Sequence, residues 1–338
     1  MRFLKIFSGI LVLLAAVYLS GPNPTTPVYS TTLPELPSND SALENYILLQ
    51  ESKHKIKPDN EARIVWANDS LKQPTEYAIV YLHGFSASQE EGNPVHRKIA
   101  RQFGCNLYLA RLAEHGIDTT DALVNMTAEK LWESAKEAYA IGQKIGKKVI
   151  LMGTSTGGTL ALQLAASYPE IAGLILYSPN VEINDPNAWL LNNPWGLQIA
   201  RKVKGSNYNI IPKKTDAYKQ YWNQEYRLEA LVQLEELLET TMNKSNFEKI
   251  KQPVLALYYY KDENNQDPVV KVAAIKKMMV SLGTPVEKEK MVAIPNAGNH
   301  VLASPIQSKD ILSVEKETAL FLQEIMHLTP LPDQKKEL

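Results

Sequence analysis

The chain has 338 residues, a formal net charge of −1 and one cysteine, Cys105. This length can bury a large core, and it fits one sizeable α/β domain with an insertion. The near-neutral charge excludes a strong field that would recruit nucleic acid, and a single cysteine excludes both an intramolecular disulfide and a cysteine-rich metal site.

The N-terminal segment has the pattern of an export signal. Two cations, Arg2 and Lys5, precede an apolar stretch over residues 6–19 that is slightly short for a full membrane span. We expect residues 1–20 to act as a signal anchor that is not cleaved, because large side chains occupy the position where cleavage needs a small one. The alternative is a signal peptide that is removed. In both cases we expect the rest of the chain to be membrane-anchored or exported, with its catalytic domain outside the cytoplasm.

Residues 21–60 are interpreted as an extended linker and lead-in segment. Proline, threonine and serine are frequent between Gly21 and Asn39, which is typical of an extended segment that does not pack. An alternation of strand and helix patterns follows. The patterns predict strands at residues 62–66, 77–82, 106–110 and 149–152, and helices at residues 94–103, 126–145 and 160–166.

After a strand expected at residues 171–177, this alternation breaks. Residues 181–250 show no good strand pattern, but they contain a leucine-rich helix pattern between Leu228 and Leu238. Alternation then resumes with strands at 253–260 and 288–294 and helices within 269–282 and 314–327. The sequence therefore predicts one α/β core in two parts, residues 61–180 and 251–330, interrupted by a helical cap at residues 181–250.

The most informative motif is Gly153-Thr154-Ser155-Thr156-Gly157. It joins an apolar strand pattern to a helix pattern, with the serine at the apex of the turn. Such a turn holds its serine in strained backbone geometry and lifts the hydroxyl clear of the sheet. The two glycines fit a turn that brings strand and helix too close for side chains. The motif predicts that Ser155 is a nucleophile.

Two later segments offer partners for this serine. A serine hydroxyl is a poor nucleophile until a base takes its proton, and the base works best when a carboxylate orients it. His300, just after the last expected strand, is the candidate base. Asp267 is the candidate acid, and Asp262, nearer the end of the preceding strand, is the alternative. The order serine, aspartate, histidine is that of one large fold.

The segment Leu82-His83-Gly84-Phe85 closes an expected strand. A turn there can point the backbone N–H of Phe85 at the reaction centre, and the N–H of Thr156 is the natural second donor. Two such donors hold the negative oxygen of a tetrahedral intermediate, and the loss of one typically costs about 3 kcal/mol. We expect His83 to support this turn through hydrogen bonds and His115 to have a structural role in its loop.

These segments, together with Asp267-Pro268-Val269-Val270 and Gly298-Asn299-His300, resemble the α/β-hydrolases. The likeness is to the branch that contains monoacylglycerol lipases, carboxylesterases and serine aminopeptidases. It implies a mostly parallel central sheet flanked by helices, with a cap at residues 181–250. It further implies a triad of Ser155, Asp267 and His300 that needs no cofactor and no metal ion. Asp267 is preferred over Asp262 because Asp-x-Val-Val matches the pattern of the family.

The resemblance implies a serine hydrolase that cleaves short- to medium-chain esters or monoacylglycerol-like lipids. A second hypothesis is an aminopeptidase of the proline-releasing type, in which acidic cap residues bind a free amino terminus. Glu182, Asp185 and Glu225 could supply such a site. A third hypothesis is a non-catalytic binding protein on the same scaffold. The third is disfavoured because every position that the chemistry needs is filled.

Overall fold

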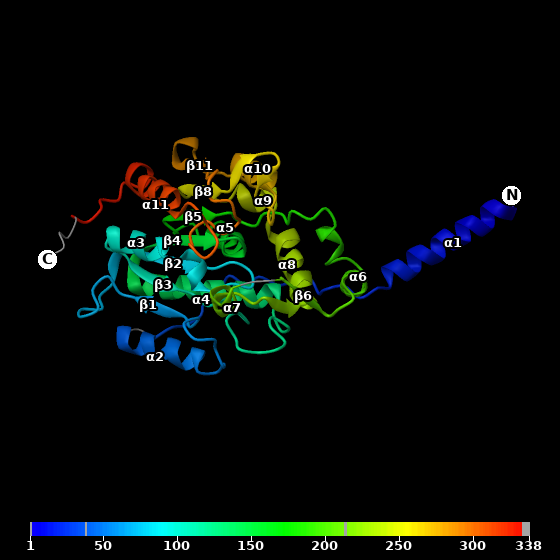
Figure 1. Ribbon diagram of the computed structural model, residues 1–338, viewed down its shortest axis with the longest axis horizontal. Coiled ribbons are helices and arrows are strands. Elements are labelled where there is room, and N and C mark those ends of the chain that lie inside the picture. The colour runs from blue at the N-terminus through cyan, green and yellow to red at the C-terminus, as the bar shows by residue number, and fades with distance from the viewer. Residues whose placement is uncertain (1, 38, 213–214, 333–338) are drawn as a thin grey trace.

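The computed structural model describes residues 2–37, 39–212 and 215–332. In this part of the chain a seven-stranded sheet forms the centre of the molecule (Figure 1). All neighbouring strands pair in parallel except β1, which is antiparallel to β3. From one edge to the other, the strands are β1 (Arg63–Val65), β3 (Asn106–Leu109), β2 (Thr75–Leu82), β4 (Gly146–Thr154), β5 (Gly173–Tyr177), β8 (Val254–Tyr258) and β11 (Glu289–Ala293).

Helices cover both faces of the sheet, and two apolar cores result. The alternation of side chains along a strand divides β2 between them, since Ala78 and Val80 belong to one core and Ile79 and Tyr81 to the other. Strands buried on both faces explain the nearly continuous apolar runs in the sequence. The predicted mostly parallel sheet flanked by helices is confirmed. One face carries α4 (Ala128–Ile145), α5 (Thr156–Ser167) and α10 (Val272–Ser281), and the other carries α3 (Val95–Gln102), α11 (Ile311–Leu320) and the π-helical turn η4 (Phe321–Ile325).

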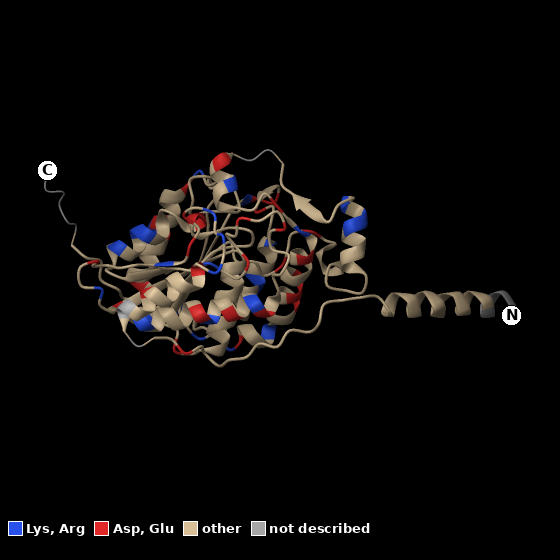
Figure 2. Ribbon diagram, turned by 90° about the horizontal axis from the view of Figure 1, so that it is seen from below, with Lys and Arg blue, Asp and Glu red and all other residues tan. Residues whose placement is uncertain are grey.

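The N-terminal helix α1 (Arg2–Leu19) projects from the body. Residues 6–19 of this helix include no Lys, Arg, Asp or Glu, whereas charged residues of both signs are mixed over the body (Figure 2). Within the described residues, no helix combines the length and hydropathy that a membrane crossing requires.

The segment after α1 is extended, as predicted, but the prediction that it does not pack is wrong. The indole N–H of Trp132 donates to the carbonyl of Ser30 at 2.7 Å, and the Lys136 ammonium donates to that of Thr32 at 2.8 Å. The Tyr168 hydroxyl donates to the carbonyl of Thr31 at 2.8 Å. These donors lie on α4 and just after α5, so residues 30–32 lie along the outside of that helix layer.

The lead-in segment also contains a helix that the sequence analysis missed, α2 (Asp40–Glu51). The Asn39 side chain caps it by accepting from the N–H of Ala42 at 2.7 Å. Leu43 and Ile47, one turn apart, are buried in the core. This i, i+4 pair after an asparagine is a helix signal, and the neighbouring proline-rich stretch obscured it.

The segment between β5 and β8 is mainly helical, but it contains two strands that were not predicted. β6 (Tyr208–Ile210) and β7 (Glu225–Arg227) form a small antiparallel sheet. Three residues are too few for a visible alternation pattern, and contacts from outside the segment stabilise the pair. The Asp121 carboxylate accepts from the Tyr208 hydroxyl and from the Arg227 guanidinium, both at 2.8 Å. The helices of this cap are α6 (Gly196–Lys204), α7 (Asp216–Tyr221), α8 (Leu228–Thr241) and α9 (Lys244–Phe247).

Candidate active site

Ser155 lies at the turn between β4 and α5, with the strained backbone angles φ 52° and ψ −117°. The strand and the helix approach so closely here that a Cβ on Gly157 would overlap the backbone carbonyl of Leu82. A Cβ on Gly153 would lie 2.5 Å from the carbonyl oxygen of Gly157. The two glycines therefore permit the sharp turn, and Ser155 lies at the carboxyl edge of the sheet, where parallel α/β sheets bind their ligands.

His300 and Asp267 are brought together from two different loops. The Nδ1 atom of His300 lies 2.7 Å from Oδ2 of Asp267. The other oxygen of Asp267 accepts from the backbone N–H groups of Val269 and Val270, at 2.9 and 3.1 Å. Because a carboxylate can only accept, Nδ1 of His300 carries the hydrogen, and Nε2 remains available as a base.

His300 and Asp267 each stabilise the charged form of the other. Burial disfavours the charged form of His300, but the charge and hydrogen bond of Asp267 and the charge of Glu91 together raise the pKa of His300 above its usual value. Burial alone would raise the pKa of Asp267. The His300 charge and the hydrogen bonds outweigh this effect and lower the pKa below its usual value. Asp267 is therefore a carboxylate at neutral pH, and His300 is a stronger base than a free imidazole.

The alternative acid, Asp262, is not part of this arrangement. It is exposed on a hairpin between β9 (Tyr260–Asp262) and β10 (Asn265–Gln266), and its carboxylate accepts from the N–H groups of Asn264 and Asn265. This hairpin contains most of the residues that separate the end of β8 from Asp267. The N–H of Asp267 then donates to the carbonyl of Tyr259 at 3.0 Å, which returns Asp267 to the end of the strand.

The turn at Phe85 is held by hydrogen bonds on both sides. Nδ1 of His83 donates to the carbonyl of Gly84 at 2.9 Å, and the N–H of Ser86 donates to Nε2 of His115 at 3.0 Å. Burial keeps the pKa of both imidazoles well below the usual value, so both are neutral. Within the described chain, the N–H groups of Phe85 and Thr156 have no acceptor, which leaves both donors available to an oxyanion.

Comparisons with known proteins agree with this architecture. A family model described as serine aminopeptidase, S33, matches residues 128–293, a range that contains Ser155 and Asp267 and ends before His300. A thermostable monoacylglycerol lipase from Bacillus sp. (strain H-257) is 29% identical over 105 residues, which is 31% of this chain and 41% of the lipase. The chain thus matches less than half the length of this curated relative.

Similar solved structures include the metagenome-derived lipolytic enzymes LipS and LipT, with a TM-score of 0.63 and 17% identity over 79% of this chain and 99% of the other. For a monoacylglycerol lipase from Paleococcus ferrophilus, the TM-score is 0.57, with 14% identity over 77% of this chain and 97% of the other. For Est1E from Butyrivibrio proteoclasticus with bound ferulic acid, it is 0.53, with 18% identity over 79% and 95%. The chain has the α/β-hydrolase fold. At these identities the structural neighbours establish the fold alone.

One residue near Ser155 was missed by the sequence analysis. Glu91 lies on the short helix η1 (Gln89–Gly92), and its Oε2 accepts from the N–H of Gly84 at 2.5 Å. Burial raises the pKa of Glu91 to about 7, against the opposing effects of the Gly84 N–H, the His300 charge and a Trp222 hydrogen bond. The stretch Gln89-Glu90-Glu91 has the composition of a solvated surface, so no sequence signal pointed to the residue.

Two further features concern what the candidate site contains. Among the described residues, no hydrogen bond joins Ser155 to His300, although both are nearly buried, with 5% and 8% exposed. Catalytic hydrogen bonds are often long before substrate binds. No cluster of three or more metal-ligating side chains occurs in the described chain.

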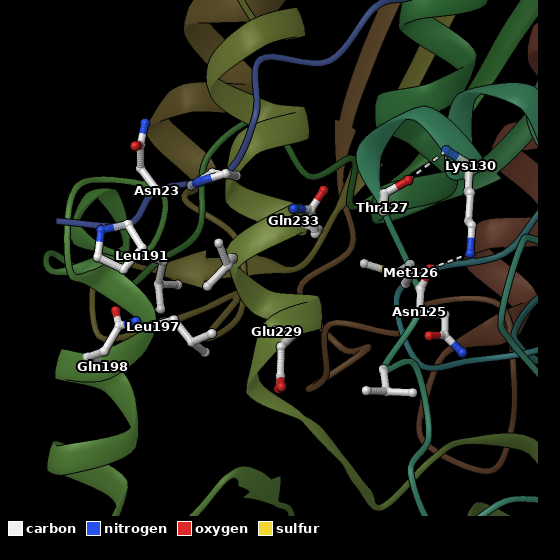
Figure 3. A pocket seen from close by; sticks show the side chains of 14 residues that line it. Asn23, Asn125, Met126, Thr127, Lys130, Leu191, Leu197, Gln198, Glu229 and Gln233 are labelled. Atoms are coloured by element: carbon white, nitrogen blue, oxygen red, sulfur yellow. Dashed lines mark hydrogen bonds between the residues drawn. The ribbon is translucent and has the colours of Figure 1, made fainter. Parts of the chain in front are cut away.

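A pocket lies between the segment joining β5 to β8 and the start of α4 (Figure 3). Its volume is about 470 Å³, within the range of small-molecule sites. Ser155, Asp267 and His300 are not among its lining residues. The apolar part of its wall consists of Pro22, Pro24, Val124, Met126, Leu191, Leu197 and Val232.

Proposed function

We propose that this α/β-hydrolase cleaves carboxylic esters through an acyl-enzyme intermediate on Ser155. The observation that carries the proposal is the 2.7 Å hydrogen bond between His300 and Asp267. It leaves Nε2 of His300 as an available base, and a serine in the strained turn typical of a nucleophile lies in the same fold. The lipolytic and esterase structures of similar fold add support.

The proposed reaction has two halves. His300 takes the proton of Ser155 as the serine oxygen attacks the ester carbonyl, and Asp267 stabilises the resulting imidazolium. The N–H groups of Phe85 and Thr156 hold the oxyanion. His300 then gives its proton to the leaving alcohol, and the acyl group stays on Ser155. Water, activated by His300 in the same way, releases the acid and restores the enzyme.

For the substrate, we propose short- to medium-chain esters or monoacylglycerol-like lipids. The support is the likeness to a monoacylglycerol lipase over part of the chain and to lipolytic folds. Serine aminopeptidase chemistry is the competing activity, because the matching family model carries that description. Two of the three acidic residues considered for binding an amino terminus have other partners. Glu182 pairs with Lys271, and Asp185 accepts from the N–H of Asn187.

The test uses a fluorophosphonate probe and two substrate sets. We expect the probe to label the wild type and not Ser155→Ala, because the probe reacts with an activated serine. We also expect turnover of p-nitrophenyl esters of two to ten carbons and little turnover of proline amides. Preferred cleavage of proline amides would favour the aminopeptidase. An unlabelled and inactive wild type would instead support a binding protein.

We also propose that α1 attaches the protein to a membrane, with the body outside the cytoplasm. Its apolar side chains are exposed, Val12 by 70% and Leu19 by 74%. Transfer of such a surface to the lipid interface is favourable by about 25 cal/mol per Å². The end of the helix meets the cap, where the Trp195 indole donates to the carbonyl of Val17 at 3.0 Å.

Flotation with phosphatidylcholine vesicles tests the attachment. We expect the full chain to float and the variant Leu11→Lys with Leu14→Lys to remain at the bottom, because both side chains are exposed on α1. Leu312→Lys, at an apolar position on the body that is 70% exposed, is the matched control and should float. Equal flotation of all three proteins would contradict the proposal. Protease added to intact cells should digest the body, and a protected body would contradict the orientation.

A further inference from the structure

Glu91 joins the oxyanion turn to the cap. On one side its Oε2 accepts from the N–H of Gly84, the residue before Phe85. On the other side, a hydrogen bond from the side chain of Trp222, which follows α7, lowers the pKa of the same carboxyl. Only 2% of Glu91 is exposed, and no lysine or arginine pairs with it in the described chain. A buried carboxyl bound to two neutral N–H donors is suited to holding them in place rather than to binding substrate.

The Glu91 carboxyl lies close to Ser155. A methyl group built on Gly84 would lie 2.8 Å from Oε2 of Glu91 and 3.0 Å from Cβ of Ser155. The carboxyl, the oxyanion turn and the nucleophile therefore surround one point. Any larger residue at position 84 would separate them.

The cap reaches the same turn by a second contact. The N–H of Asn223 donates to the carbonyl of Ser86 at 2.8 Å. Two further contacts hold Trp222 in place. The ring of Tyr218 stacks on its ring, with 5.1 Å between the centroids, and the Lys57 ammonium donates to its backbone carbonyl at 3.2 Å. The turn is therefore tied by His83 and His115 from the core, and by Glu91 and residues 222–223 from the cap side. In the described chain, none of these hydrogen bonds uses the N–H of Phe85, which remains available as a donor.

We propose that Glu91 is a positioning residue whose carboxyl holds the Gly84–Phe85 peptide in the orientation that presents the Phe85 N–H, and that it makes this orientation depend on the docked cap through Trp222. The inference rests on the proposed serine hydrolase chemistry. Without Glu91 the peptide can rotate, and the oxyanion loses a donor that is needed in the transition state. The defect should appear in kcat rather than in KM.

Substitutions at Glu91 test the positioning. We expect Glu91→Ala to lower kcat on p-nitrophenyl butyrate about 100-fold with KM changed less than about threefold, since misplacement by 1 Å can cost that much. Glu235→Gln is the matched control. Glu235 is also buried, on α8, and burial raises its pKa to about 7. No hydrogen bond links it to the turn in the described chain, so its variant should keep the wild-type kcat.

A double variant tests the link to the cap. In Glu91→Gln, an NH₂ group replaces one of the two carboxyl oxygens, so the amide has a single acceptor oxygen for the N–H of Gly84 and the indole of Trp222. We expect kcat to fall about tenfold. Trp222→Phe removes the indole donor, so the glutamine can turn its oxygen to Gly84 without a clash. The double variant should therefore be at least as active as Glu91→Gln, although Trp222→Phe alone is impaired.

The pH profile supplies a readout that a merely structural role would not move. His300, Tyr81 and Tyr218 are the titratable groups around the carboxyl. The Glu91 charge is one of the causes that raise the pKa of His300. The acid limb of kcat/KM should therefore shift to lower pH in Glu91→Gln. The folded state favours protonated Glu91, so this residue costs stability as pH rises from its unfolded pKa to about 7. The difference in stability between Glu91→Gln and the wild type should therefore favour the variant more at pH 8 than at pH 5.

The outcomes separate this inference from the proposed function. A wild type that neither reacts with the fluorophosphonate probe nor hydrolyses esters would overturn the proposed function itself. An active, labelled wild type with an equally active Glu91→Ala would overturn only the role of Glu91. If Glu91→Ala does not fold, the other variants decide. A double variant far less active than Glu91→Gln, with an unmoved acid limb, would refute the positioning role.

Discussion

At the scale of single residues, the site depends on which carboxylate orients the base. Asp267 contacts His300 and is buried, whereas Asp262 is exposed and caps its own hairpin. We expect Asp267→Asn to lower kcat about 10⁴-fold, because an amide can leave His300 in the wrong tautomer. Asp262→Asn should keep most of the activity. Steady-state hydrolysis of a p-nitrophenyl ester measures both, and the reverse ranking would identify Asp262 as the acid.

The pH dependence follows from the same pair. The base must be neutral to accept a proton, and the pKa of His300 is raised above its ordinary value of 6.5. We therefore expect kcat/KM to rise with pH and to reach its plateau only above pH 7. His300→Ala should lack turnover across the whole range. A profile already flat from pH 5 upward would show that His300 is not the titrating base.

At the scale of elements, the junction of β4 and α5 controls the geometry of the nucleophile. Gly157 touches the backbone at Leu82, and no movable side chain lies between them. We expect Gly157→Ala to lower the free energy of unfolding by about 3 kcal/mol and to abolish esterase activity, because the strand end and the helix must separate. Urea unfolding and the esterase assay measure these effects.

The matched control is Gly205→Ala at the end of α6. Unlike Gly157, this glycine has a positive φ of 62°, and no heavy atom lies within 4 Å of the added methyl. Only the backbone strain remains, so we expect a loss of about 1 kcal/mol and normal activity. Equal effects at the two glycines would mean that the close approach of β4 and α5 does not matter.

At the scale of the whole molecule, the N-terminal segment is part of the folded body. Residues 28–32 hydrogen-bond to α4, to Tyr168 and to Thr240 on α8. We expect a chain that begins at residue 21 to unfold at nearly the same urea concentration as the full chain, and one that begins at residue 40 to be less stable by several kcal/mol. The shorter chain removes the acceptors of the Trp132 indole and the Tyr168 hydroxyl, at about 1 kcal/mol or more each. It also removes the Thr32 carbonyl from Lys136, which keeps its ion pair with Glu133. Equal stability of the two truncated chains would show that the segment is only a linker.

The features that could be predicted from the sequence are those whose signal is local. Apolar runs predicted the strands, and the Gly-x-Ser-x-Gly motif predicted the strained turn at Ser155, because short contiguous stretches impose these backbone shapes. Tertiary contacts alone placed Asp267, and not Asp262, beside His300, revealed Glu91, and packed the proline-rich segment against α4. Each of these depends on partners from distant parts of the chain, such as Gly84 and Trp222 for Glu91. Such pairings arise when the folded backbone brings the groups together, and they leave no periodic pattern in the chain.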